Sequence, residues 1–176
     1  DMSSAKEAVS YAKKIHGDLI EISLFKYPKV AIETIKKDPP DILALSNYSW
    51  NSLLSEHVAK IAKSINPNVI TVQGGPNFPH DSEQQLKFII QRPNTDFYIE
   101  LEAEVSFSNL LDRVLKYRNK KHELFDGPIN GCVFVQKNRG KNLIKGSKPH
   151  RIKFLDDIPS PYLSGMLDGF FDGKLS

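Results

Sequence analysis

Two hydrophobic periods alternate along this chain. In some segments apolar residues recur every three to four positions, which is the spacing of an amphipathic helix. Between these segments apolar residues alternate with polar ones or form short continuous runs, as in half-buried or fully buried strands. The helical segments are 4–16, 28–37, 53–65, 81–90 and 104–118, and the strand segments are 18–25, 41–46, 68–73 and 96–100. This order predicts an α/β fold: a Rossmann-like or flavodoxin-like open parallel sheet with helices on both faces and right-handed crossovers.

Several residues mark where the helices begin. Ser3 or Ser4 is placed to cap the first helix, and Glu7 is placed for a capping box with Ser4. Pro28 begins the second helix, where its missing N–H costs nothing. Asp81 or Ser82 caps the short fourth helix. The first predicted element is thus a helix, whereas in flavodoxin-like sheets the chain begins with a strand inside the sheet. We therefore expect either a strand that precedes Asp1 or a sheet with one strand fewer.

The pattern changes after residue 120. Residues 131–146 are typical of two strands around Asn138-Arg139-Gly140, a β-hairpin. Residues 155–173 contain Pro159, Pro161 and several glycines, as in a connector between domains. We therefore expect residues 1–122 to form the α/β domain and residues 123–176 to form a hairpin and a connector.

Composition narrows the class of protein. The chain has 176 residues, 40% of them hydrophobic and 26% charged, which suits one globular domain with appendages. Cys132 is the single cysteine, which excludes an internal disulfide and a cluster held by several thiolates. A reducing, cytoplasmic location is therefore the expectation. The apolar runs fall short of the roughly 18 residues of a membrane span, so no membrane partner is expected.

Positive charge is concentrated in one part of the chain. Residues 113–153 contain twelve Lys/Arg but only two acids, Glu123 and Asp126, although the net charge of the whole chain is only +3. The segment is either an ordinary solvated surface or a face that docks an acidic partner. Aromatic residues do not interleave the basic ones as they would in a stacking platform, which argues against nucleic acid.

Three loops follow the carboxyl ends of predicted strands, where open α/β sheets bind their ligands. They are SNYSWN (46–51), GGPNFPH (74–80) and ELEAE (100–104). Gly74 and Gly75 would let a flat group lie on bare backbone, and Tyr48 and Trp50 supply flat apolar area. The hydroxyl and amide groups of 46–51 offer hydrogen bonds. These features favour a large planar cofactor that bears amides, although Gly-Gly-Pro could also be only a tight turn.

Familiar catalytic motifs are missing from these loops. The sequence has no GxGxxG, no P-loop, no strand-end aspartate of a receiver domain and no GxSxG. His57 lies on a predicted helix and is taken as structural or solvated, whereas His80 follows the glycine turn and could face a ligand. Cys132 lies in an apolar strand and is taken as a small core residue. We assign no catalytic residue and no metal ligand.

Four motifs occur in a characteristic order: DILALSNYSWN, VITVQGGPNFP, DFYIELEAEVSFSNLL and IPSPYLSGMLDGFF. Together they resemble the cobalamin-binding domain at the N-terminus of B12-dependent radical S-adenosylmethionine (SAM) proteins. The resemblance covers nearly the whole chain. It implies that the loops surround the lower side and nucleotide tail of cobalamin. The residues it implies for cofactor binding are Ser46, Asn47, Tyr48, Ser49, Asn51, Gln73, Gly74, Gly75, Pro76, Asn77 and Glu102.

The chain departs from this pattern in three ways. The D-x-H-x-x-G motif with its cobalt-ligating histidine is absent, as is general in the radical SAM members, so cobalamin would bind without a histidine ligand. The usual G-E-G-E is Leu101-Glu102-Ala103-Glu104. The C-x3-C-x2-C that holds a [4Fe–4S] cluster is also absent. The resemblance therefore implies a domain that does not itself catalyse, whose partner is its own C-terminal radical SAM domain. That domain would bind the cluster and S-adenosylmethionine.

Two other interpretations remain at this stage. The domain could have kept the fold, lost cobalamin and become a structural or docking module. More distantly, it could be a flavodoxin-like module for another ligand, such as a flavin.

Overall fold

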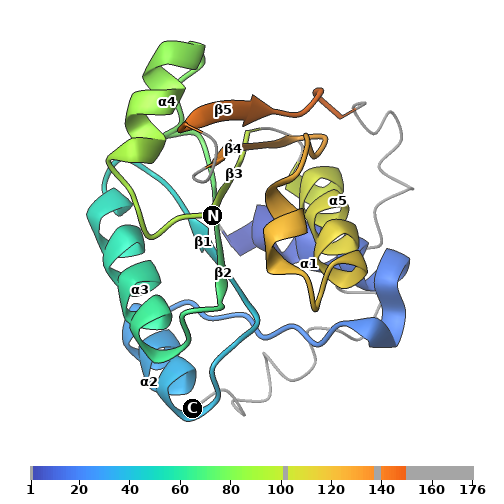
Figure 1. Ribbon diagram of the computed structural model, residues 1–176. Helices are drawn as coiled ribbons and strands as arrows, with labels where there is room; N and C mark the ends of the chain where they lie inside the picture. Colours follow the sequence, from blue (N-terminus) through green and yellow to red (C-terminus); the bar gives the residue numbers. More distant parts are fainter. Residues whose placement is uncertain (1, 101–102, 137–139, 150–176) are drawn as a thin grey trace.

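A mixed five-stranded sheet lies between two layers of helices (Figure 1). The computed structural model describes residues 2–100, 103–136 and 140–149, with side chains described from residue 5 onward. The strands are β1 (Ile42–Ser46), β2 (Ile70–Gly74), β3 (Phe97–Ile99), β4 (Cys132–Gln136) and β5 (Asn142–Lys145). Their order across the sheet is the same as their order along the chain.

The three parallel strands end at the same level. Ser46 of β1 is the register partner of Gly74 of β2, which is in turn the partner of Ile99 of β3. The loops that leave these strands therefore start side by side at one edge of the sheet. The other two strands reverse direction, because β4 is antiparallel to β3 and β5 is antiparallel to β4.

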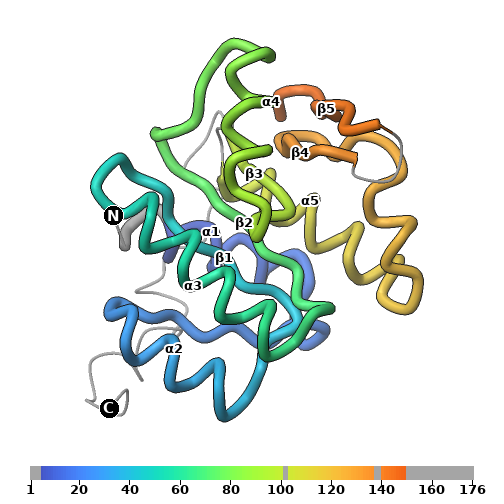
Figure 2. Tube along the Cα trace, turned by 60° about the vertical axis from the view of Figure 1, so that its left-hand side comes forward, coloured from blue at the N-terminus to red at the C-terminus, as the bar shows by residue number. Residues whose placement is uncertain are grey.

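The helices are divided between the two faces of the sheet. α1 (Met2–His16) packs on α5 (Ala103–Lys116), and both lie on one side in Figure 1. On the opposite side lie α2 (Pro28–Lys37), α3 (Ser52–Ile65) and α4 (Ser82–Ile90), and Figure 2 shows α2 and α3 side by side. The chain crosses from the first face to the second between α1 and α2. The predicted α/β sheet with helices on both faces is confirmed.

Alternate residues of the strands build the cores on the two faces. Val72, Phe97 and Ile99 point to α5 and pack with its Leu110 and Val114. On the other face, β1 packs against α2 and α3, and β3 and β4 pack against α4. Because β2 and β3 are buried on both sides, their residues form the nearly continuous apolar runs seen in the sequence.

The helix signals predicted for α2 and α4 are confirmed. Pro28 is the first residue of α2. Asp81 is the N-cap of α4, and its carboxylate accepts hydrogen bonds from the backbone N–H groups of Glu83 and Gln84 at 3.0 and 3.1 Å. The predicted cap of the first helix is wrong, because α1 already begins at Met2 and Ser3 and Ser4 lie within it.

The strand predicted at 18–25 is wrong. A short 3-10 turn, η1 (Gly17–Leu19), follows α1, and residues 20–25 are irregular. These residues still alternate in exposure, because Ile20, Ile22 and Leu24 are half-buried and the residues between them are exposed. A strand is stabilised by ladder hydrogen bonds to a neighbour. In the described structure no neighbouring strand pairs with this segment, so the sequence pattern alone does not produce one.

The predicted hairpin is confirmed and belongs to the main sheet. β4 pairs with β3, and Gln136 of β4 is the register partner of Asn142 of β5. Cys132 and Phe134 are fully buried in the α5-side core. The sequence did not predict η2 (Lys121–Phe125), a 3-10 turn before the hairpin that contributes Leu124 to this core.

Two expectations lie outside the described residues: the centre of the hairpin turn, and the connector at 155–173. The boundary at residue 122 therefore stays a prediction. Among the described residues, no helix is both long enough and apolar enough to cross a membrane.

Candidate cofactor-binding rim

The first loop, residues 46–51, is held in shape by Asn51. Its side-chain oxygen accepts a hydrogen bond from the Tyr48 backbone N–H at 2.7 Å, and its side-chain nitrogen donates to the Ser46 carbonyl at 3.2 Å. The Ser55 hydroxyl donates to the same carbonyl at 2.9 Å. Asn51 therefore orders the loop immediately before α3 begins at Ser52.

Asn47 joins the first loop to the second, residues 74–80. Its backbone N–H donates to the Gly74 carbonyl at 2.7 Å, and its carbonyl accepts from the Asn77 N–H at 3.4 Å. The Asn47 side-chain nitrogen donates to the Asn77 backbone carbonyl, and the Asn77 side-chain nitrogen donates to the Asn47 side-chain oxygen, both at 3.5 Å. Asn47 is only 1% exposed. The first two loops thus form one interlocked unit, which we call the rim.

The two glycines of the rim differ in what surrounds them. Gly75 has a φ of +141°, and a Cβ there would lie 2.4 Å from the Asn47 carbonyl oxygen. A Cβ on Gly74 would meet Ile99 at 3.6 Å, an ordinary contact. The bare backbone of Gly75 is therefore occupied by the neighbouring loop. The sequence predicts that both glycines leave room for a flat ligand, whereas the structure gives Gly75 a packing role.

Gln73 lies beneath the rim and is completely buried. Its side-chain nitrogen donates to the Thr95 hydroxyl at 2.7 Å, and that hydroxyl donates to the Glu56 carboxylate of α3 at 3.1 Å. The Gln73 side-chain oxygen and the Tyr98 hydroxyl are buried without a hydrogen-bond partner in the described part of the chain. Burial raises the pKa of the Tyr98 phenol above its usual value. Gln73 therefore links β2 to α3 through the Thr95 hydroxyl and the Glu56 carboxylate.

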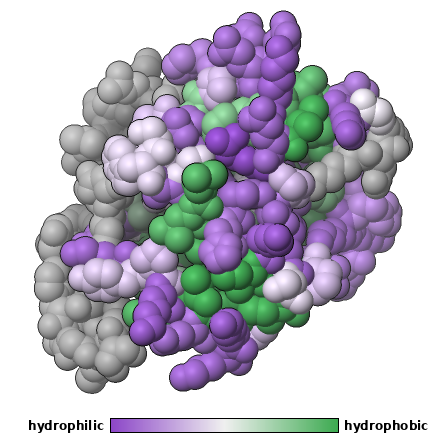
Figure 3. Space-filling model, turned by 90° about the vertical axis from the view of Figure 1, so that its left-hand side faces the viewer, coloured by the Kyte–Doolittle hydropathy of each residue, from purple (hydrophilic) through white to green (hydrophobic). Residues whose placement is uncertain are grey.

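The first loop of the rim carries an apolar surface that continues into the start of α3. The rings of Tyr48 and Trp50 stack with centroids 4.5 Å apart and planes 13° from parallel. The Trp50 residue is 80% exposed, and Leu53, the second residue of α3, is 88% exposed. Large apolar side chains on a surface often mark a binding site. Figure 3 views the side of the molecule that carries α2, α3 and α4, where apolar surface is exposed among hydrophilic side chains.

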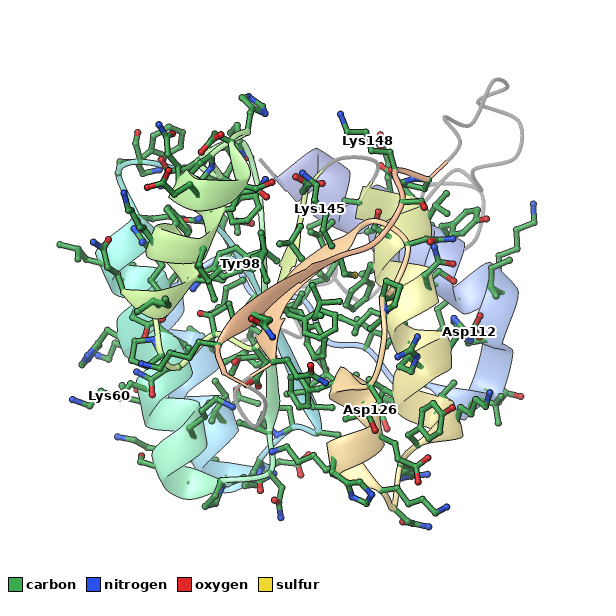
Figure 4. All side chains as sticks on the ribbon, turned by 45° about the horizontal axis from the view of Figure 1, so that its top comes forward. Lys60, Tyr98, Asp112, Asp126, Lys145 and Lys148 are labelled. Carbon is green, nitrogen blue, oxygen red and sulfur yellow. The ribbon has the colours of Figure 1, made fainter. Side chains whose placement is uncertain are left out.

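The third loop is described only at Glu100, which follows β3. Its carboxylate accepts from the Gln85 side chain at 2.7 Å and forms an ion pair with Lys145 at 3.1 Å. Gln85, on α4, also donates to the Pro79 carbonyl in the second loop at 2.8 Å. Figure 4 shows Lys145 on β5, the last strand of the sheet. This network ties the second loop, α4 and the hairpin together.

The structure brings most of the predicted cofactor-binding residues together. Ser49 and Pro76 are exposed, and Gln73 lies beneath them. Glu102 lies outside the described residues. The members of the set that lie in the two interlocked loops are Ser46, Asn47, Tyr48, Ser49, Asn51, Gly74, Gly75, Pro76 and Asn77.

Two histidines and the single cysteine were singled out in the sequence as candidate structural or ligand-facing residues. His57 and His80 are both exposed. Cys132 is fully buried in the core, and burial raises the pKa of its thiol to about 12. The described residues contain no group of three or more His, Cys, Asp or Glu that could hold a metal ion.

Sequence reasoning missed His16, Gln85 and Lys145. His16 is buried between α1 and α5, where its Nε2 lies 3.0 Å from the Ser108 hydroxyl. The helical period placed His16 at the end of α1, but nothing in the sequence identified a partner 92 positions away. Gln85 and Lys145 contact Glu100 from 15 and 45 positions away (100 − 85 and 145 − 100). Such distant contacts have no local signal.

Several basic side chains of the segment 113–153 are used within the domain. The Arg113 guanidinium donates to the backbone carbonyls of residues 126, 127 and 128. Lys121 donates to the Pro67 carbonyl at 3.2 Å. Lys120 pairs with Glu123 at 3.2 Å, and Lys145 pairs with Glu100. Several basic side chains of this segment therefore make contacts within the domain.

The sequence is similar to those of two curated methyltransferases. The chain is 38% identical over 131 residues to the cobalamin-dependent radical SAM methyltransferase TokK of Streptomyces tokunonensis. It is 32% identical over 131 residues to the 2-(S-pantetheinyl)-carbapenam-3-carboxylate methyltransferase of Streptantibioticus cattleyicolor. Each match covers 74% of this chain and 18% of the relative. The chain thus spans under a fifth of the length of these two curated relatives.

A third similar protein is also a methyltransferase by name, and one similar solved structure is that of a cobalamin-dependent enzyme. An uncharacterized methyltransferase of Pyrococcus horikoshii is 32% identical over 129 residues, which is 72% of this chain and 25% of that protein. The apo structure of the cobalamin-dependent S-adenosylmethionine radical enzyme OxsB covers 93% of this chain and 22% of its own, with a TM-score of 0.63. At 20% identity this likeness shows a shared fold. No protein-family model matches the chain.

Proposed function

We propose that this chain, which belongs to the B12-binding radical SAM proteins as their cobalamin-binding-type domain, binds cobalamin at the rim formed by its first two loops. The observation that carries the proposal is the stacked Tyr48–Trp50 pair on the first of the interlocked loops. Burying the exposed indole on the flat face of a macrocycle would remove a large apolar area from water. The rim lies at the carboxyl ends of parallel strands, where such sheets bind ligands.

The side chains of the rim divide into a supporting group and a contacting group. Asn47 and Asn51 have their amides bonded within the rim, so they hold its shape. The exposed Ser46 and Ser49 hydroxyls and the indole of Trp50 are the groups placed to touch a ligand. A planar apolar surface bordered by hydroxyls fits a corrin, whose ring is flat and whose edge carries amides. Within this domain the corrinoid would be held without a histidine ligand to cobalt.

The activity of the whole protein is part of the same proposal. A bound corrinoid would support methyl transfer or a related radical reaction. Its partner would be the protein's own radical SAM domain, which would bind the [4Fe–4S] cluster and S-adenosylmethionine, in the cytoplasm. The names of the relatives support methyl transfer. This domain supplies the cofactor platform and is not itself catalytic.

Retention of hydroxocobalamin tests the proposal. The natural full-length protein and its Trp50→Ala variant are mixed with hydroxocobalamin, passed over a desalting column and examined by visible spectroscopy. The wild-type protein should keep the corrin bands, and the variant should keep much less. Ile90→Ala is the matched control, because Ile90 is an exposed apolar residue at the far end of α4, away from the loops. Equal retention by all three proteins would contradict the proposed contact.

A second candidate is a docking module that has lost cobalamin. The specific observation in its favour is that the glycine turn packs on Asn47, so Gly75 leaves no open backbone for a cofactor. Under this interpretation the wild-type full-length protein keeps no corrin bands after desalting. Retention of a flavin absorption spectrum in the same assay would support the third candidate, a flavodoxin-like module.

A further inference from the structure

Helix α4 packs against the second loop of the rim through aromatic rings. Phe78 of that loop is buried, and its ring stacks on Tyr98 of β3 with centroids 4.8 Å apart and planes 8° from parallel. Phe88 of α4 meets the rings of Phe78 and Tyr98 edge-on, at 5.4 and 5.3 Å. Stacked and edge-on arrangements are those in which aromatic rings attract each other. The second loop is therefore fixed to α4 through the Phe88 ring.

Arg92 follows the end of α4, and its side chain runs back along the helix to the same ring. The guanidinium carbon lies 3.5 Å from the centre of the Phe88 ring, and Nη1 donates to the Phe88 carbonyl at 3.1 Å. A guanidinium over an aromatic face is held by cation–π attraction. The Arg92 head group is thus fixed on the ring that packs against the second loop.

The other arm of the guanidinium reaches the end of the first loop. Its Nη2 donates to the Ser52 hydroxyl, 40 positions away in the chain, at 3.0 Å. Ser52 is buried and is the first residue of α3. It follows Asn51, whose side chain bonds to the Tyr48 N–H and the Ser46 carbonyl. A shift of Ser52 would therefore displace the side chain that orders the first loop.

The two loops are thus connected in two ways. Asn47 joins them directly at the edge of the sheet. The second connection runs through the helices, from the second loop to Phe88, Arg92 and Ser52, and α3 and α4 lie on the same side in Figure 1. It reaches the first loop two residues after Trp50. A guanidinium suits this place because its planar fork stacks on a ring and donates in two directions, which an ammonium group does not.

We propose that Arg92 is a positioning residue of the rim. It holds the start of α3 against α4 and so sets where the first loop, with the Trp50 indole, lies relative to the second loop. Arg92 acts through Ser52 and does not itself contact the cofactor. Its effect on cobalamin binding rests on the proposed function, whereas its hold on the first loop rests on the contacts of the guanidinium alone.

Amide hydrogen exchange tests the hold on the first loop without cobalamin. Exchange is followed by mass spectrometry in the natural full-length protein, in a peptide that spans residues 46–51 and includes the bonded Tyr48 N–H. Arg92→Ala and Ser52→Ala should each speed this exchange several-fold, because local opening becomes easier. Arg118→Ala is the control, since it removes an exposed arginine beyond the end of α5. Exchange as slow as in the wild type in both test variants would overturn the proposal.

Titration with hydroxocobalamin tests the effect on binding. The Kd is measured by visible absorbance in the full-length protein, at a temperature at which thermal denaturation shows every variant to be folded. Loss of folding then cannot imitate loss of binding. Arg92→Ala should raise the Kd about tenfold, as expected when a charge-assisted hydrogen bond that orders a site is removed. Arg92→Lys should lose part of the affinity, because it keeps the charge but not the fork.

Ser52 variants show whether Arg92 acts through this hydroxyl. Ser52→Ala should weaken binding, whereas Ser52→Thr, which keeps the hydroxyl, should bind as the wild type does. The double variant of Arg92→Ala and Ser52→Ala should bind no more weakly than Arg92→Ala alone, because the bond is already lost. Ser52→Ala also keeps the stacked guanidinium, so it serves as the test should Arg92→Ala fail to fold.

The outcomes separate this proposal from the proposed function. A wild-type protein that binds hydroxocobalamin, together with an unchanged Kd in Arg92→Ala or additive losses in the double variant, would overturn the positioning role alone. A wild-type protein that binds no hydroxocobalamin would overturn the proposed function. The exchange experiment would then still decide whether Arg92 holds the first loop.

Discussion

The first and second loops of the rim touch each other through Asn47, yet their distinctive residues have opposite surroundings. The glycine turn of the second loop is packed on backbone, with the place of a Gly75 side chain taken by the Asn47 carbonyl. The first loop instead holds Tyr48 and Trp50 as a stacked pair with the indole mostly exposed. Gly75, which has no side chain, is thus enclosed within the rim and contributes to its packing. The bulky and exposed feature is the one available to a ligand.

Gly75→Ala should give the largest effect on folding. The added Cβ would lie 2.4 Å from the Asn47 oxygen at a φ of +141°. Backbone strain and overpacking together should lower the free energy of unfolding by about 2–4 kcal/mol, measured by chemical denaturation. Gly74→Ala is the control, because its Cβ makes an ordinary contact at 3.6 Å, and it should cost less. Equal losses for the two variants would remove the special role of Gly75.

Cys132 lies in the core, where its burial makes the free energy of unfolding depend on pH. Its folded pKa of about 12 lies above the usual value of about 8.5, so above pH 8.5 the unfolded state loses a proton that the folded state keeps. The contribution of Cys132 is complete below pH 8.5 and is lost as pH rises toward 12. The free energy of unfolding should fall by up to about 1.4 kcal/mol per pH unit between pH 8.5 and 10. Denaturation of Cys132→Ala should show a shallower pH dependence, and an unchanged slope would exclude this cause.

Asn47→Ala tests whether the two loops depend on each other. The variant removes the side-chain amide but keeps the backbone hydrogen bonds to Gly74 and Asn77. The amide contacts are long, at 3.5 Å, so the expected loss of stability is about 1 kcal/mol. Ser49→Ala, at an exposed position of the same loop, should change the free energy by less than about 0.5 kcal/mol. Faster exchange of the Asn77 N–H should accompany the loss in Asn47→Ala alone.

Trp50→Ala should give the smallest effect on stability. The indole is 80% exposed, so its removal should change the free energy of unfolding by less than about 0.5 kcal/mol. Measured beside the retention of hydroxocobalamin, this variant separates binding from folding. A large loss of stability would mean that the stacked pair supports the rim, as Gly75 does, and the contrast between the loops would disappear.

Local patterns predicted the parts of the fold that local interactions decide. The helices 28–37 and 53–65, the strands at 41–46 and 68–73 and the hairpin are confirmed within one or two residues at most ends. The pattern at 18–25 is equally regular, but a strand also needs a neighbour, and pairing depends on distant residues. The prediction failed at this segment for that reason.

The candidate site shows the same limit. The order of strands and loops was enough to place residues 46–51 and 74–80 together, because parallel strands share one carboxyl edge. It was not enough to show that Asn47, and not a ligand, occupies the space beside Gly75. Glu100 was recognised as part of an acidic loop, but its bonds to Gln85 and Lys145 come from separate elements brought together by folding.

The ion pair between Glu100 and Lys145 connects the hairpin to the second loop of the rim. Lys145 belongs to the last described strand, and Glu100 is joined through Gln85 to the Pro79 carbonyl of the second loop. Glu100 is only 13% exposed, so separating the pair would leave a poorly hydrated carboxylate behind. Lys145, Glu100 and Gln85 therefore form a continuous line of contacts from β5 to the second loop, and a displacement of β5 that breaks the ion pair would remove one support of the rim.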